Sequence, residues 1–485
     1  MTTRIFLAST LYGTATLAAA LDCDLFGPAD RRILVVCNNT ATPETTPPLD
    51  ELPGFARLRE RFDDVVSWNE MISPCHPGGW APRQDDVPLW ERHLRLLWNL
   101  GDDAVELAVE SIQVNPALGV CQIFTGAPVT VYADGLMSYG PTRNKIDPLV
   151  GTRIDRLLHL DLVPGLRPVL LTEFGVTPEI VPTDAFVKVL AELADAGDAL
   201  PELPAEPALL LGQYLSALGI LTAEEEEALH VRMLRGAVAL GHTRVVFKPH
   251  PSAPARWSRA LEQEAGRLSA DLTVLSSPVL AEVLYQRIRP ALVVGCFSTA
   301  LCTASALYGL PVARTGTGTL LERLTPYENS NRVPVTIVDA LLPDLADGPA
   351  VTGQRQGGGQ GQEHGRGQGQ GQGRRHAPGA AADGAAADEI PADGAPAADV
   401  DALTELVRAV SYAMQPKLYP NLRADAERYL AAHFGTDARR YFKRRRLTAL
   451  ALPGGVPQQL AFIPRNAAVR RVARRARSLG RAVGR

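Results

Sequence analysis

The sequence predicts an α/β protein built from two parallel-sheet domains. Three observations support this prediction: short apolar segments alternate with helix-like segments, the alternation occurs twice, and a proline-rich segment separates the two runs. The chain has 485 residues, more than one ordinary hydrophobic core organises. Its content of 46% hydrophobic and 21% charged residues is typical of a soluble globular protein.

The first domain is predicted over residues 1–200. It opens with a strand, a turn, a helix that ends near Leu21 and a second strand, the order expected of a parallel sheet with crossover helices. Apolar residues at helical spacing predict a helix over Leu89–Val114, with a possible break at Gly101. The predicted strands are Arg4–Ala8, Arg32–Cys37, Val120–Phe124, Val129–Tyr132, Leu158–Leu162 and Val169–Leu171.

The second domain is predicted over residues 205–350, after the proline-rich connection. Thr222 and Glu225 form a capping box that starts a helix reaching about Leu240. The other predicted helices are Trp257–Leu268, Pro278–Ile288 and Ala300–Leu307, and the strands are Ala208–Leu211, Arg244–Phe247, Leu272–Leu275 and Leu292–Val294. Two Rossmann-like domains in tandem face each other across a cleft, and ligands of such sheets bind beyond the carboxyl ends of the strands.

Three further segments follow the two domains. Residues 351–399 are rich in Gly, Gln, Ala and Asp, so they lack the apolar surface for a core and are predicted to be a disordered insertion. Helical patterns resume at residues 400–414 and 422–434, which predicts C-terminal helices over 400–450 that pack back on the body. Residues 451–485 form a basic, arginine-rich tail.

Net charge, cysteine content and the start of the chain indicate which partners and which cellular compartment to expect. The net charge of −4 gives no reason to expect a nucleic-acid partner. Six cysteines without any C-x-x-C pair are typical of reduced, mostly buried thiols. Polar residues interrupt the apolar segment at the start of the chain, which is against a secretory signal. A cytoplasmic protein is therefore expected.

Polar residues follow three of the predicted strands. Asp134-Gly135 places a carboxylate at a sheet edge, where it can accept a proton from a hydroxyl, although the same pair also suits an ordinary turn. In Lys248-Pro249-His250-Pro251 two prolines restrict the backbone around an imidazole, beside an ammonium that suits a phosphate. The alternative is a solvent-facing turn histidine.

The third strand end is Cys296-Phe297-Ser298-Thr299, which opens an alanine-rich helix. The hydroxyls and free backbone N–H groups at such a helix start can receive a phosphate, but they also cap the helix without a ligand. A carboxylate on one domain and a histidine with an anion-binding helix start on the other suit glycosyl transfer with inversion, in which a base activates the acceptor opposite the departing phosphate.

These residues resemble the acidic, His-Pro and serine motifs of bacterial sialyltransferases, and their order is most similar to the α-2,8-polysialyltransferase family. Ser9-Thr10-Leu11-Tyr12 resembles the first hydroxyl-bearing loop of that family. The resemblance covers residues 3–345 and 400–435. It implies a GT-B fold, a CMP-sialic acid donor, a glycan acceptor, inversion, no obligatory metal, no cofactor beyond the donor, and a role in capsule or other polysaccharide biosynthesis.

The resemblance also implies roles for single residues. Asp134 is the candidate base, and His250 is the candidate acid and phosphate contact. The candidate nucleotide- and phosphate-binding residues are Gly212, Gln213, Lys248, Pro251, Ser298 and Thr299, and the candidate donor-loop residues are Ser9, Thr10, Tyr12 and Gly135. Arg143 and Lys145 are candidates to meet an anionic acceptor, with plain surface charge as the alternative.

The chain departs from the family pattern at one position. The acidic motif usually has two consecutive acids before its glycine, and here Ala133 occupies the first. Either Asp134 serves as the base alone or activity is lost. The alternatives that remain are a CDP-polyol or other nucleotide-sugar transferase, a catalytically silent nucleotide-sugar-binding homologue, and a membrane-surface scaffold.

The basic residues near the C-terminus form two clusters. One spans residues 439–446, and the other runs from Arg465 to Arg485 without an acidic residue. Apolar residues spaced by three and four within the second cluster predict a basic amphipathic helix, which suits peripheral contact with an anionic membrane at its inner face. Nucleic-acid binding and a solvated, disordered tail are the alternatives.

Overall fold

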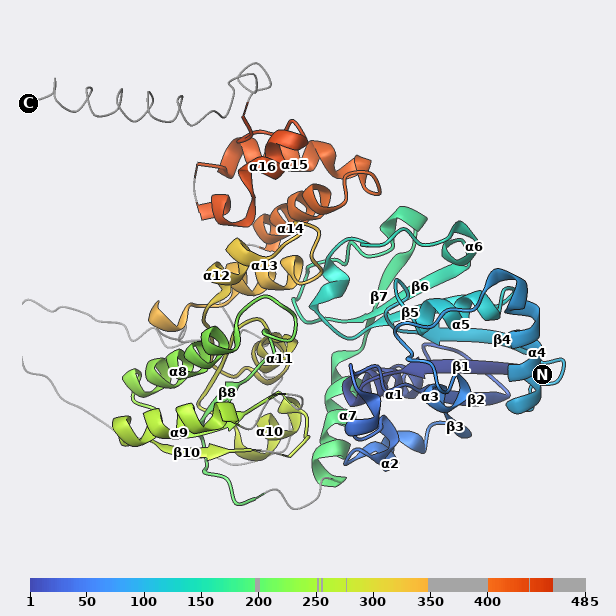
Figure 1. Cartoon of the computed structure of the whole chain (residues 1–485), viewed down its shortest axis with the longest axis horizontal. Coiled ribbons are helices and arrows are strands. Elements are labelled where there is room, and N and C mark those ends of the chain that lie inside the picture. Colours follow the sequence, from blue (N-terminus) through green and yellow to red (C-terminus); the bar gives the residue numbers. More distant parts are fainter. Residues whose placement is uncertain are drawn as a thin grey trace, which may run out of the picture. The chain divides into compact units, whose positions relative to one another are not determined.

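The computed structural model describes residues 1–196, 201–250, 253, 256–275, 277–347, 400–435 and 437–456. The predicted insertion at 351–399, residues 457–485 of the predicted tail and Pro251 lie outside the described residues. Two parallel sheets organise the described chain, one of seven strands and one of five (Figure 1). The predicted fold class, with two Rossmann-like α/β sheets, is confirmed.

The first sheet has the strand order β3-β2-β1-β4-β5-β6-β7, and every neighbouring pair is parallel. Its strands are β1 Thr2–Ala8, β2 Arg31–Val36, β3 Asp64–Ser67, β4 Ala104–Val109, β5 Val129–Ala133, β6 Ile154–Leu160 and β7 Thr177–Val181. Its helices are α1 Leu11–Asp22, α2 Phe55–Arg59, α3 Trp68–Met71, α4 Val87–Leu97, α5 Ala117–Ile123, α6 Pro148–Gly151 and α7 Thr183–Ala196. The order reverses between β1 and β4, where such sheets bind ligands.

Three predictions for the first domain were wrong. The predicted helix over Leu89–Val114 is the helix α4 followed by the strand β4, because the apolar residues of β4 also fit helical spacing. The predicted strand Val120–Phe124 is the helix α5, a short apolar run whose periodicity does not separate the two states. The predicted strand Val169–Leu171 is absent because Leu171 takes a left-handed φ of 64°.

The second sheet has the order β10-β9-β8-β11-β12 and is also parallel throughout. Its strands are β8 Ala208–Leu211, β9 Arg244–Lys248, β10 Asp271–Val274, β11 Leu292–Gly295 and β12 Val312–Arg314. Its helices are α8 Ala223–Ala239, α9 Arg256–Leu268, α10 Ala281–Ile288, α11 Thr299–Tyr308, α12 Thr317–Arg323 and α13 Arg332–Leu341. The predicted capping box of Thr222 and Glu225 is present at the start of α8.

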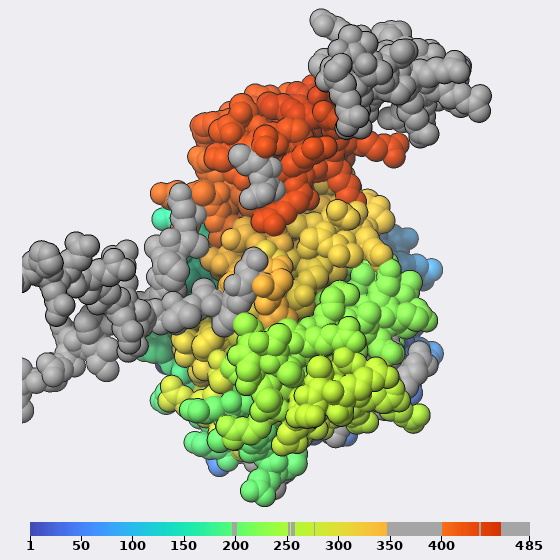
Figure 2. All heavy atoms as spheres, turned by 90° about the vertical axis from the view of Figure 1, so that its left-hand side faces the viewer, coloured from blue at the N-terminus to red at the C-terminus, as the bar shows by residue number. Residues whose placement is uncertain are grey.

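After the insertion the chain forms α14 Val400–Met414, α15 Arg423–His433 and α16 Arg444–Ala449. Figure 2 shows these helices against the segment of α12 and α13, and Tyr441 donates to Asp339 of α13 at 2.9 Å. The first basic cluster is partly used in these contacts: Arg440 pairs with Asp339, and Arg446 pairs with Glu328. These cations hold the C-terminal helices to the body.

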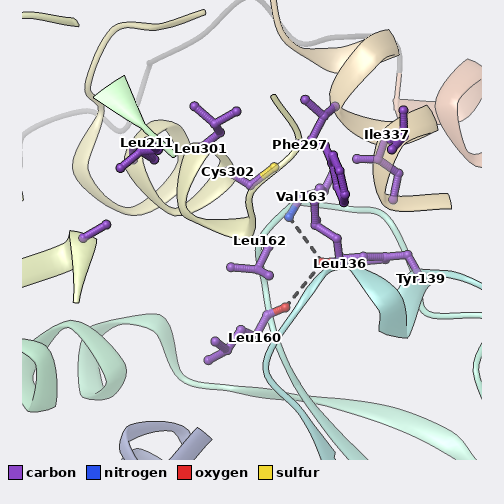
Figure 3. Close-up of a cluster of buried hydrophobic side chains, with 14 of the residues drawn as sticks. Leu136, Tyr139, Leu160, Leu162, Val163, Leu211, Phe297, Leu301, Cys302 and Ile337 are labelled. Atoms are coloured by element: carbon purple, nitrogen blue, oxygen red, sulfur yellow. Dashed lines mark hydrogen bonds between the residues drawn. The ribbon is translucent and has the colours of Figure 1, made fainter. Parts of the chain in front are cut away.

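Two hydrophobic clusters cover the two faces of the first sheet, because successive strand residues point to opposite faces. Val109, Val131 and Ala133 pack in the cluster on one face, whereas Ala108 and Tyr132 pack in the cluster on the other. This second cluster is continuous with the core of the second sheet and the C-terminal helices. Figure 3 shows a part of it, where side chains of the two α/β domains meet: Leu136, Tyr139, Leu160, Leu162, Val163, Leu211, Phe297, Leu301, Cys302 and Ile337.

Two properties of the whole chain follow from the described residues. All six cysteines are unpaired, as their spacing predicts, and only Cys75 among them is exposed. Across the described ranges, every helix is too short or too polar to serve as a membrane span.

Candidate active site

Polar residues gather at the carboxyl ends of the central strands of both sheets. In the first sheet, Ser9 and Thr10 follow β1, Glu110 follows β4, and Asp134 follows β5. In the second sheet, Gly212 follows β8, His250 lies beyond β9, and Ser298 follows β11. Both groups lie at the point where the strand order of their sheet reverses.

Two cavities, of about 590 Å³ and 610 Å³, lie at these strand ends. The first cavity is lined by the residues after β4 and β5 and by the loop after β8. The second is lined by the start of α1, the loop after β2 and the start of α10. Six residues line both cavities: Asp134, Gly135, Gly212, His250, Ser298 and Thr299. Asp134 and His250, predicted from separate motifs, thus border the same space.

The start of α1 holds the carboxylate of Asp134. Thr10 caps the helix by accepting from the backbone N–H of Gly13 at 2.9 Å, and its hydroxyl lies 3.5 Å from Asp134 Oδ2. A Cβ atom at position 13 would lie 3.2 Å from that same oxygen, so glycine allows the close approach. Burial raises the pKa of Asp134, and the hydrogen bond from Thr10 opposes this.

Glu110 is a second buried carboxylate of the site, and the sequence interpretation missed it. Its Oε2 atom would lie 3.0 Å from a Cβ at position 13, so it approaches the same glycine as Asp134. The side chain accepts from the hydroxyl and backbone N–H of Ser9 and from Tyr132 Oη at 3.3 Å. Burial, together with the charge of Asp134, raises the pKa of Glu110 to about 7. An acid directly after an apolar segment was the available signal, hidden by the helix predicted there.

His250 and Lys248 form the basic side of the site. His250 is exposed where it borders both cavities, and its ring centroid lies 6.2 Å from that of Tyr214. Loss of hydration, followed by the charge of Lys248, lowers the pKa of His250. Lys248 lines the second cavity, and burial lowers its pKa while Glu282 opposes that shift.

The start of α11 forms the third part of the site. Ser298 is the N-cap, and its side chain accepts from the backbone N–H of Ala300 at 3.3 Å. Thr299 lies close to Gly135 of the first domain: a Cβ added at Gly135 would be 3.3 Å from Thr299 Oγ1. The hydroxyls and the positive end of the helix dipole at this start can bind an anion.

The remaining predicted site residues have structural contacts as well. Gln213 lines the first cavity, and its Oε1 accepts from the backbone N–H of Phe297 at 2.9 Å. Gly212 is closely packed, because a Cβ there would lie 3.0 Å from the ring of Phe247. Tyr12 lines the second cavity and places its hydroxyl 3.5 Å from Thr303 Oγ1 of α11.

Solved structures with a similar arrangement share little sequence with the chain. A sialyltransferase GT-B domain from Photobacterium damselae is 12% identical over 72% of this chain and 99% of that one, with a TM-score of 0.38. The S. aureus MnaA–UDP structure is 12% identical over 70% and 88%, with a TM-score of 0.40. An O-GlcNAc transferase mutant from Thermobaculum terrenum is 12% identical over 64% of this chain (TM-score 0.31), which spans about half, 52%, of that chain.

Sequence comparison gives a sharper result. No curated protein matches the chain in sequence. The family model for alpha-2,8-polysialyltransferase matches residues 4–317, a range that contains both sheets and every polar residue described at the two cavities.

Proposed function

The chain belongs to the alpha-2,8-polysialyltransferase family, and from this premise we propose that it transfers sialic acid or a related acidic sugar from a CMP-activated donor to a glycan acceptor, with inversion at the anomeric carbon. The coarser statement, that the chain is a glycosyltransferase, rests on the family. The observation that supports the finer proposal is the shared border of the two cavities, where a carboxylate from one sheet meets an imidazole from the other.

The second cavity suits the nucleotide donor. Lys248, His250 and the start of α11 line it, so a phosphate there gains an ammonium, an imidazole and backbone N–H donors. The lowered pKa of His250 keeps the imidazole neutral in the empty site at neutral pH. An arriving phosphate supplies opposite charge, which favours the protonated ring that a leaving phosphate requires.

The first cavity suits the acceptor. An acceptor hydroxyl placed beside Asp134 gives its proton to that carboxylate, and its oxygen attacks the anomeric carbon of the donor sugar. The bond from that carbon to the phosphate oxygen breaks, and CMP leaves toward His250 on the opposite side. Attack from the face opposite the leaving group inverts the anomeric carbon.

Nucleotide binding tests this proposal. We expect calorimetry to show that CMP binds more tightly than UDP, and that His250→Ala weakens CMP binding by roughly 10- to 100-fold, the value of one charge-assisted hydrogen bond. His242→Ala is the matched control, because His242 follows α8 and lines neither cavity. It should leave CMP affinity unchanged.

Donor turnover separates the alternatives. The proposal expects CMP release from CMP-sialic acid in the presence of a glycan acceptor, and release that persists in EDTA. Turnover of a CDP-polyol without turnover of CMP-sialic acid would establish the other transferase. CMP binding without turnover of any donor would establish a silent homologue.

A further inference from the structure

Position 133 holds alanine where the family motif has an acid, but Glu110 supplies a carboxylate close by, just after the neighbouring strand β4. β4 and β5 are parallel neighbours with Val109 opposite Val131, so Glu110 lies opposite Tyr132 at the end of the sheet. Ala133 packs in the cluster on the other face of the sheet, together with Val131. Ala133 also lines the first cavity, but successive residues of a strand point to opposite faces, so Glu110 lies on the same face of the sheet as Tyr132 and Asp134.

Glu110 has the surroundings of an organised functional group. It is buried and lines the first cavity, and Ser9 and Tyr132 direct donors at it. Tyr132 itself is fixed by donating to the backbone carbonyl of Leu7 at 2.8 Å. A buried carboxylate with no structural ion pair is costly, and such groups concentrate where a reaction uses them. Within the described part of the chain, no ion pair includes Glu110.

We propose that Glu110 is the second carboxylate of the catalytic base, supplied by β4 in place of the acid missing at position 133, and that its negative charge increases the basicity of Asp134. This rests on the proposed function, in which Asp134 accepts the proton of the acceptor hydroxyl. Glu110 acts only through Asp134 and is a positioning residue. The positive end of the α1 dipole offsets part of the repulsion between the two carboxylates.

The pair predicts a particular pH dependence. Asp134, just after β5, is the group whose charge acts on Glu110, and the charge of Glu110 in turn raises the pKa of Cys37 after β2. Tyr132 is hydrogen-bonded to Glu110, and His250 lines the same cavity. Burial, together with the charge of ionised Asp134, raises the pKa of Glu110 to about 7. The doubly ionised pair is the stronger base, so we expect kcat to rise through about pH 7. This is the apparent pKa of the coupled pair and not of one carboxyl group alone.

The test compares pH–rate profiles of four forms of the full chain. Glu110→Gln removes the second ionisation, so we expect the acidic limb to move at least one pH unit lower and kcat at pH 8 to fall about 10-fold or more. Tyr132→Phe removes a donor that stabilises the ionised Glu110, so its limb should move to higher pH. Glu106→Gln is the control, because Glu106 lies on the same strand and pairs with Arg4 away from the cavities. Its limb should coincide with that of the natural protein.

The outcomes distinguish this inference from the proposed function. An acidic limb that stays in place in Glu110→Gln, with only a uniform loss of rate, overturns the role of Glu110. Full activity in Asp134→Asn overturns Asp134 as the base and, with it, the role of Glu110, but leaves the transfer activity itself in place. Absence of CMP release from CMP-sialic acid in the natural protein overturns the proposed function. CMP affinity, measured on each variant, reports the second cavity and confirms that the variant is folded. Should Glu110→Gln fail to fold, the opposite shift expected of Tyr132→Phe still decides the question.

Discussion

At the scale of single residues, Arg143 places a cation at the wall of the first cavity. It lines the first cavity, and burial lowers the pKa of its guanidinium, which nevertheless stays charged at neutral pH. Its backbone N–H donates to the side chain of Gln113, and its carbonyl accepts from Gln415, so the backbone is held from both sides. Among the described residues no ion pair involves it. Its charge is thus available to an anionic acceptor in the first cavity.

We therefore predict that Arg143→Gln raises KM for an anionic glycan acceptor by about 10-fold and changes kcat little, since one charge-assisted contact is worth roughly 1.5–3 kcal/mol. Steady-state kinetics with acidic and neutral acceptors would measure this. Lys145→Gln is the matched control, because Lys145 is exposed and lines neither cavity. Equal effects of the two substitutions would point to general surface charge.

The individual site residues differed in how visible they were in the sequence. His250 was predictable because it follows an apolar segment and stands between prolines, two signals that do not depend on the rest of the fold. Asp134 was predictable as a residue beside glycine after a strand. Glu110 was not predictable, because its place in the candidate site depends on its proximity to Asp134. That proximity follows from the strand register, which no local sequence pattern contains.

At the scale of elements, α11 has a cap residue that also lies at the candidate active site. Ser298 caps the helix and lines both cavities, so its hydroxyl lies where the leaving phosphate is proposed to bind. Thr222 caps α8 through a full capping box but lines neither cavity. Substituting each cap in turn therefore distinguishes an effect on helix stability from an effect on anion binding.

We predict that Ser298→Ala and Thr222→Ala each lower the free energy of unfolding by about 1 kcal/mol, the usual contribution of an N-cap. Only Ser298→Ala should weaken CMP binding, by several-fold. Denaturant unfolding and calorimetry on both variants would measure this. A loss of CMP affinity in Thr222→Ala equal to that in Ser298→Ala would mean that stability, and not the hydroxyl, controls binding.

Most elements of the second sheet were predictable, whereas the first sheet contained the errors. Strands β8, β9 and β11 are short apolar runs bounded by helices, and their burial on both faces matches that pattern. The edge strand β7 carries proline and glutamate, so its composition gave no strand signal. In β4, Glu106 interrupts the apolar run and pairs with Arg4 of β1. Such a partner 102 residues away is invisible to a local pattern.

At the scale of the whole molecule, the segment between α14 and α15 contacts loops of the first domain. The Tyr419 hydroxyl accepts from the backbone N–H of Thr142 at 2.9 Å and donates to Glu173. Gln415 donates to the carbonyl of Arg143 at 2.7 Å. A segment beyond the insertion therefore fixes the loop that carries Arg143 into the first cavity.

We predict that Tyr419→Phe lowers the free energy of unfolding by about 1–3 kcal/mol, because it leaves a buried N–H and a carboxylate without this partner. The same change should raise KM for the acceptor and leave CMP affinity unaltered. Thermal unfolding, acceptor kinetics and calorimetry would measure the three quantities. Tyr412→Phe is the control, since the Tyr412 hydroxyl accepts from Arg423, away from the loop. A change in CMP affinity in Tyr419→Phe would contradict this division of the site.

The hydrophobic cluster of Figure 3 packs beside the residues that border both cavities. Leu136 comes two residues after Asp134, and Phe297 immediately precedes Ser298. Apolar packing therefore sets the spacing between the carboxylate of Asp134 and the hydroxyl of Ser298. A substitution that creates a void in this cluster would change that spacing as well as the stability of the fold.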